Sequence, residues 1–170
     1  PKRALSSFEK KIIGKKSDIQ EDSPSEDLLT PDKEILANLE DEKPTFLSII
    51  RAREASLFNS FVPYTSKVLD FGCGDGFFTE ISLIGCEQKV DIGLETNSVR
   101  AIKARKSSIY KKVLVYDGRK IPLSNSSISV VISNSVMEHL SDVEISLIEI
   151  HRILKRGGSF YVSVMTDRYE

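Results

Sequence analysis

The sequence contains no tryptophan and only two cysteines and two histidines among its 170 residues. So few cysteines cannot build a disulfide framework, and the scarcity of thiol and imidazole ligands argues against a zinc site. We therefore expect no bound metal and a reduced, cytoplasmic setting. No apolar run approaches the ~20 residues of a membrane-spanning helix, and the basic start lacks the apolar segment of a secretory signal. The formal net charge of -1 argues against a nucleic-acid partner.

Hydrophobic residues make up 40% of the chain and charged residues 29%, which is typical of one globular domain. Residues 1–29 carry a basic block and then an acidic, serine-rich block, so we expect a charged, mobile arm. Residues 30–63 are expected to form helices on the lid or substrate side, entered at Thr30-Pro31. Residues 64–170 are expected to form an α/β ligand-binding domain. Because the first residue is Pro1, we expect a processed or partial chain.

Apolar residues at helical spacing predict a helix over 44–61, ended by Pro63. They are Phe46, Leu47, Ile50, Leu57, Phe58 and Phe61. After Pro63, strands are predicted over 67–71, 89–94, 113–116, 128–133 and 159–165, with helices over 77–84, 97–107 and 142–154. In the second of these helices Val99, Ile102 and Ala104 are expected to face inward. Gly157-Gly158 is expected to end the third. The alternation predicts an α/β fold with a doubly wound, mostly parallel sheet.

The most informative segment is the turn after the first predicted strand. Asp70 ends this strand, and Gly72, Gly74 and Gly76 follow at alternate positions. Glycines let a ligand sit against the main chain, and open α/β sheets bind ligands at the carboxyl ends of their strands. Glu95 ends the second predicted strand, where an acidic residue can bind the ribose hydroxyls of a nucleoside.

Two cofactors compete for such a turn. The dinucleotide fingerprint requires a glycine where Phe77 stands, and a phosphate prefers a helix N-terminus without nearby carboxylates. Here Asp70 precedes the turn and Asp75 lies within it. These charges suit an ammonium and a sulfonium, so the pattern favours S-adenosylmethionine over NAD.

From Lys67 to Met165 the sequence resembles the class I S-adenosylmethionine-dependent methyltransferases, especially the small-molecule group that includes ubiquinone and menaquinone biosynthesis enzymes. The resemblance is carried by the motifs at 68–76, 93–95, 116–118, 121–128, 133–140 and 149–158. It implies a Rossmann-like methyltransferase fold, a small-molecule methyl acceptor, and S-adenosylhomocysteine as product. The family's sheet normally has two more strands, so we expect either a truncated sheet or one whose fifth strand is covered by a partner, a second copy or the arm.

The resemblance also implies roles for individual residues. Asp70 is expected near the methionine ammonium, Glu95 at the ribose and Asp117 at the adenine amino group. Thr96 is expected to flank the adenine. Other residues are expected to contact the cofactor largely through main chain: Gly72, Cys73, Gly74, Gly118, Asn134 and Ser135. Asn97 is expected either beside the adenine or only as a helix cap. For Cys73 a packed thiol is favoured over a reactive one.

A general base is needed only if the acceptor must lose a proton, and His139 and Glu138 are the candidates. His139 is equally compatible with a structural role. Arg51 and Arg53 on the first long helix could meet an anionic acceptor or the cofactor carboxylate. Ser129 stands where the family usually has Asp, and this departure leaves open a non-catalytic S-adenosylmethionine-binding regulatory or interaction module. An NAD-dependent oxidoreductase is disfavoured.

Overall fold

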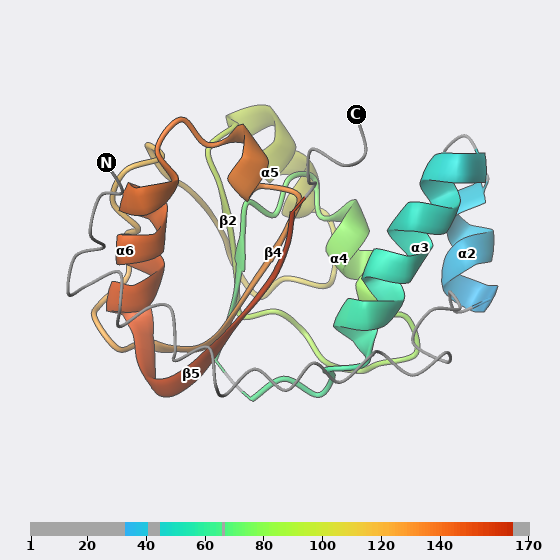
Figure 1. Ribbon diagram of the computed structural model, residues 1–170, viewed down its shortest axis with the longest axis horizontal. Helices are drawn as coiled ribbons and strands as arrows, with labels where there is room; N and C mark the ends of the chain where they lie inside the picture. The colour runs from blue at the N-terminus through green and yellow to red at the C-terminus, as the bar shows by residue number, and fades with distance from the viewer. Residues whose placement is uncertain (1–32, 41–44, 66, 165–170) are drawn as a thin grey trace, which may run out of the picture.

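The computed structural model describes residues 33–40, 45–65 and 67–164 (Figure 1). The predicted arm and the Thr30-Pro31 helix entry lie outside these residues. The N-terminal helices are α2 (Lys33–Glu40) and α3 (Thr45–Asn59). The remaining elements are β1 (Val68–Phe71), α4 (Phe77–Ser82), β2 (Ile92–Glu95), α5 (Ser98–Ala104), β3 (Val113–Val115), β4 (Ile128–Asn134), the 3-10 helix η3 (Met137–His139), α6 (Val143–Ile153) and β5 (Leu154–Ser163).

All five strands run parallel in the order β3-β2-β1-β4-β5. This confirms the predicted doubly wound α/β sheet. The chain moves outward from β1 to β3, then returns to the other side of β1 with β4. The strand order therefore reverses between β1 and β4, which is where ligands bind in open sheets of this kind.

The central strands are buried on both faces, as the continuous apolar run of β4 predicts. Val130 and Ile132 pack in the cluster beneath α4 and α5, whereas Val131 packs with Ile150 and Ile153 of α6. In Figure 1, α6 lies on one side of the sheet and α3 and α4 on the other. The N-terminal helices join this second layer through a separate cluster of α2, α3 and α4 residues.

The inward face of α5 differs from the prediction. Val99 and Ile102 are 65% and 51% exposed, whereas Ala101 and Ala104 are fully buried. Ala104 is therefore inward as predicted, whereas Val99 and Ile102 are not. At Ala104 the helix packs against the end of the glycine turn, since a Cβ on Gly76 would lie 3.5 Å from the Ala104 Cα atom.

The helix predicted over 44–61 is present as α3, and its buried positions are mostly small residues. Leu47, Leu57 and Phe61 are exposed, whereas Ser48, Ala52, Ala55 and Phe58 are buried. Small residues again make the contact, here with α2 and α4.

The end of α6 was also predicted wrongly. The helix ends at Ile153 and β5 begins at the next residue, so Gly157 and Gly158 lie inside the strand. The pairing of β4 with β5 shifts between Ile128 and Val130, which face Leu154 and Ser159. The glycines accommodate this irregularity, and Gly157 has a φ of +76°.

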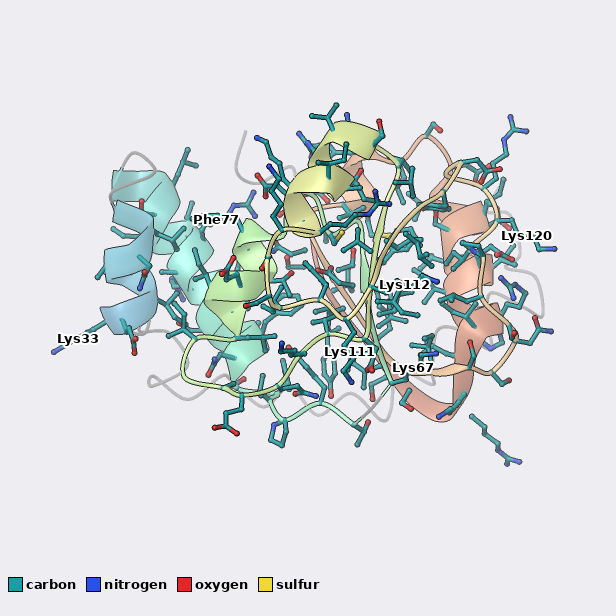
Figure 2. All side chains as sticks on the ribbon, turned by 180° about the vertical axis from the view of Figure 1, so that it is seen from behind. Lys33, Lys67, Phe77, Lys111, Lys112 and Lys120 are labelled. Atoms are coloured by element: carbon teal, nitrogen blue, oxygen red, sulfur yellow. The ribbon has the colours of Figure 1, made fainter. Side chains whose placement is uncertain are left out.

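The two ends of the parallel strands are marked by residues that directly precede or follow them. Lys67 and Lys112, which precede β1 and β3, lie well away from Phe77, the first residue of α4 (Figure 2). Since the strands are parallel, the lysines mark the amino edge and Phe77 marks the carboxyl edge. Within the part of the chain that the structure describes, every helix is too short or too polar to span a bilayer.

Candidate functional site

A cavity of about 530 Å³ opens at the carboxyl edge of the sheet. Its wall is formed by the turn after β1, the end of β2, the end of β4 and the segment leading into η3, with α3 and α4 closing one side. Its volume falls within the range of pockets that hold a cofactor or a small substrate. The cavity therefore occupies the position that the strand order indicates.

The glycine turn forms the floor of this cavity. The amides of Gly72 and Cys73 both donate to the carbonyl oxygen of Leu94, at 2.8 and 3.0 Å, which ties the turn to β2. Gly72 and Gly74 have φ values of +75° and +58°. A Cβ on Gly72 would lie 2.5 Å from Val136 Cγ2, whereas a Cβ on Gly74 would meet open space. A side chain at position 72 would thus collide with Val136, whereas the space beside Gly74 is open toward the cavity.

Glu95 fixes the other side of the turn. Its Oε2 accepts from the Gly74 amide at 2.8 Å, and its Oε1 accepts from the amides of Thr96 and Asn97 at 2.8 Å each. The side chain is largely buried but lines the cavity. Oε1 also lies 3.3 Å from the Thr96 hydroxyl, whereas Oε2 accepts, among the described residues, only from the Gly74 amide, so Oε2 keeps capacity for a hydroxyl donor from a ligand.

Asp70 has a different environment from the one expected. Its carboxyl group is buried and absent from the cavity wall. Oδ2 instead accepts hydrogen bonds from Thr79 Oγ1 and Tyr110 OH, both at 2.6 Å. Burial raises the pKa of Asp70 to about 6, and these two hydrogen bonds limit the rise. Contact between Asp70 and the methionine ammonium stays a prediction, and the geometry favours an indirect role.

Only some of the residues that were expected near the adenine line the cavity. Thr96 lines the cavity, whereas Asp117 and Gly118 are absent from its wall. Asp117 Oδ1 accepts from the amides of Arg119 and Lys120, at 2.9 and 3.2 Å, and these bonds lower its pKa. The arrangement matches a turn residue, and the adenine contact of Asp117 stays a prediction.

Asn97 forms the N-terminal cap of α5. Its side chain accepts from the amides of Val99 and Arg100. Of the two interpretations from the sequence, the structure therefore supports the helix cap.

Arg51 joins α3 to the end of β4. One of its terminal nitrogens donates to Ser135 Oγ at 2.7 Å and to Asn134 Oδ1 at 3.1 Å, and pairs with Glu54 at 2.8 Å. Arg51, Asn134 and Ser135 all line the cavity, so the structure brings them together. Ser135 has a φ of +48°, which is uncommon for a residue with a side chain. Arg53, the other arginine considered from the sequence, is exposed.

Only one of the two candidate bases lines the cavity. His139 is exposed to solvent and lines the cavity, whereas Glu138 is exposed and absent from the wall. Cys73 packs in the core beneath α4 and α5, and burial raises the pKa of its thiol well above its usual range. This environment supports the packed-thiol interpretation.

Sequence reasoning missed Thr79 and Tyr110, which hold the Asp70 carboxyl group. Neither carries a local signal, because Thr79 lies nine residues and Tyr110 40 residues along the chain from Asp70. Sequence reasoning also missed a hydrogen-bond network outside the cavity wall. Arg152 donates to both carboxylate oxygens of Glu149 at 2.7 Å, and its NH2 reaches the Ile121 carbonyl oxygen at 2.9 Å. These bonds anchor the loop that leads from β3 to β4.

The structure contains no group of three or more His, Cys, Asp or Glu side chains suited to a metal ion among its described residues. Three chemical elements therefore define the cavity: a main-chain turn, a partly free carboxylate, and an arginine that is paired with Glu54 and bound to two polar side chains. This donor set suits a ligand that carries hydroxyls, a carboxylate and a positive charge.

Residues 69–162 match the family described as Methyltransferase domain. A malonyl-acyl-carrier-protein O-methyltransferase from Hamiltonella defensa is 28% identical over 100 residues, which cover 59% of this chain and 38% of that protein. A ubiquinone biosynthesis O-methyltransferase from Bartonella quintana is 24% identical over 138 residues, which cover 75% of this chain and 54% of that protein.

A similar solved structure is a methyltransferase in complex with a Haloferax volcanii methyltransferase activator. It has a TM-score of 0.55 and 27% identity, over 65% of this chain and 50% of that chain. The chain thus spans 38% to 54% of the length of these three proteins.

Proposed function

The chain belongs to the methyltransferase-domain family, and from that premise we propose that it transfers a methyl group from S-adenosylmethionine to a small-molecule acceptor. The observation that carries the proposal is the cavity wall formed by the glycine turn and Glu95. One carboxylate oxygen of Glu95 holds the Gly74 amide at 2.8 Å and still borders the cavity. A single side chain can therefore shape the turn and accept a ribose hydroxyl.

The residues of the cavity fit the whole cofactor. The open space beside Gly74 suits close main-chain contact with the methionine part. Arg51, Asn134 and Ser135 offer a cation and polar atoms for its carboxylate and ammonium groups. Thr96 and Tyr116 border the cavity near the end of β2 and suit the nucleoside part. Asp70, buried next to the turn, adds a negative charge on the same side of the sheet.

The chemistry requires little from the protein. When bound, S-adenosylmethionine supplies a methyl group on a positively charged sulfur, which a nucleophile can attack directly. The residues of this chain orient the two reactants and exclude water, and orientation alone can contribute ~7–11 kcal/mol. His139 lies on the cavity rim, where it can accept a proton from a hydroxyl acceptor.

The acceptor class is supported by the kind of relatives. Both named relatives are O-methyltransferases, one of them in ubiquinone biosynthesis. We therefore favour an oxygen nucleophile. The ubiquinone relative supports a small metabolite as its carrier, whereas the name of the other relative gives a substrate attached to an acyl-carrier protein. The helices α2 and α3 close one side of the cavity through Leu39 and Arg51 and are the elements best placed to select the acceptor.

Calorimetric titration with S-adenosylhomocysteine tests the proposal, using the wild-type chain and Glu95→Gln. A charge-assisted hydrogen bond contributes about 1.5–3 kcal/mol, so Glu95→Gln is expected to weaken binding at least about tenfold. Asp91→Asn is the matched control. Asp91 directly precedes β2, at its other end, and accepts from the Val68 amide and from Lys111 outside the cavity.

The proposal fails if the wild-type chain binds NADH but not S-adenosylhomocysteine, or if Glu95→Gln and Asp91→Asn have equal effects. Turnover of S-adenosylmethionine with phenolic and carboxylic acceptors then separates an enzyme from a non-catalytic binding module. Binding without turnover in every case would favour the module.

A further inference from the structure

Burial of the ionised Asp70 carboxyl group lowers the stability of the fold, and none of the described residues forms an ion pair with it. Two hydroxyl groups, from Thr79 and Tyr110, bind the same oxygen at 2.6 Å. A buried carboxylate without a cation is destabilising, so its presence calls for a reason other than stability.

Tyr110 contacts the glycine turn with its ring as well as Asp70 with its hydroxyl. A Cβ on Gly76 would lie 2.9 Å from the Tyr110 Cε2 atom, and a Cβ on Gly93 would lie 3.2 Å from its Cδ1 and Cε1 atoms. The ring therefore touches the backbone of the turn and of β2 at positions where a side chain would collide with it. Tyr110 itself is buried and follows α5, so it connects the end of β1, the glycine turn and β2.

Burial and one neighbouring carboxylate oppose the charge of Asp70. Glu95 from β2 raises its pKa by repulsion. Tyr64, Cys73 and Tyr110 face it from the segment after α3, from the glycine turn and from the segment after α5, and each carries a pKa raised by burial. No lysine or arginine contributes to these shifts, so the hydroxyls of Thr79 and Tyr110 supply the stabilisation of the ionised form.

We propose that Tyr110 is a positioning residue for cofactor binding, whose ring supports the glycine turn and whose hydroxyl holds the Asp70 carboxylate beside it. The inference rests on the proposed function. Through this contact the negative charge next to the turn becomes available to a cationic ligand at neutral pH. Tyr110 touches neither the cavity nor the ligand and acts through Asp70 and the turn.

The test is the pH dependence of S-adenosylhomocysteine binding, measured by calorimetry between pH 5 and 8.5 for the wild type and for Tyr110→Phe. Wild-type affinity is expected to fall as Asp70 becomes protonated near pH 6. Tyr110→Phe keeps the ring but removes one hydrogen bond to the ionised form. The midpoint of the fall is then expected to move upward by about one pH unit.

Tyr64→Phe is the matched control. Tyr64 is also buried and lies near Asp70, but its hydroxyl donates to the Phe58 carbonyl oxygen at 2.7 Å. We expect this variant to keep the wild-type midpoint. Thr79→Val removes the other hydroxyl on Asp70 and is expected to move the midpoint in the same direction as Tyr110→Phe, which covers the case that Tyr110→Phe does not fold.

An unchanged midpoint in both Tyr110→Phe and Thr79→Val, with normal binding by the wild type, would overturn this inference and leave the proposed function standing. An equal upward movement in Tyr64→Phe would also overturn it, because burial of any tyrosine would then be sufficient. Absence of S-adenosylhomocysteine binding by the wild type at every pH would overturn both.

Discussion

Replacing Asp70 by asparagine should stabilise the fold while weakening cofactor binding. Burial raises the pKa of this carboxyl group to about 6 from an ordinary 3.8. At about 1.4 kcal/mol per pH unit, ionised Asp70 lowers the unfolding free energy by about 3 kcal/mol near neutral pH. Because the pKa of Asp70 is raised in the folded state, the folded state holds this proton more tightly than the unfolded state does. The contribution of Asp70 to the unfolding free energy is therefore largest below pH 4 and is lost as pH rises through 6.

The neutral asparagine avoids this cost but leaves its amide group to be accommodated. We therefore expect Asp70→Asn to raise the unfolding free energy by about 1–3 kcal/mol at pH 7.5, with a gain that shrinks toward pH 4.5. Urea unfolding followed by circular dichroism at both pH values measures this. Asp91→Asn, which removes the ion pair with Lys111, is expected to lower stability instead.

Two results would refute the reasoning. One is a loss of stability in Asp70→Asn that is the same at pH 7.5 and 4.5, since the carboxylate would then not be the source of a pH-dependent cost. The other is unchanged S-adenosylhomocysteine affinity in a folded Asp70→Asn protein, since the charge would then serve no ligand.

Three further predictions concern the surroundings of the site. Gly72→Ala should destabilise the protein by more than about 3 kcal/mol, because the new Cβ would collide with Val136 and because alanine would have to adopt a positive φ. Gly74→Ala should cost only about 1 kcal/mol, and equal melting temperatures would contradict the difference. Arg152→Lys keeps the charge but loses the two-pronged contact with its carboxylate partner; we expect a loss of about 1–3 kcal/mol in urea unfolding, and no loss would show that the network is dispensable. Asn97→Ala should cost about 1 kcal/mol in thermal unfolding and Asn97→Ser much less, whereas equal losses would argue against the cap.

The architecture could be predicted because it depends on local patterns. The acidic strand end and the alternate glycines from Gly72 to Gly76 predict a strand, a turn and a helix without knowledge of distant residues. The apolar run in β4 likewise predicts burial on both faces. Glu95 was expected at the end of the second strand, and the sheet order brings that end beside the glycine turn.

The inward face of α5 was predicted correctly only for Ala104, because periodicity favours large apolar residues such as Val99 and Ile102 over a small one such as Ala101. In α5 the contact is made by Ala101 and Ala104, whose small size permits close packing, while Val99 remains exposed. The hydrogen-bond partners of Asp70 could not be predicted from the sequence either. Tyr110 lies 40 residues away in the sequence, and only the folded arrangement brings its hydroxyl to the carboxylate.

The direct passage from α6 into β5 has a consequence for how this region can vary in length. No loop separates Ile153 from Leu154. One extra residue at this junction would rotate the helix by about 100° or send every following strand side chain to the opposite face. The register shift around Gly157 and Gly158 is the only nearby place, among the described residues, where the pairing already tolerates surplus chain. Insertions and deletions in this region should therefore be accepted at residues 155–158 and rejected at the helix boundary.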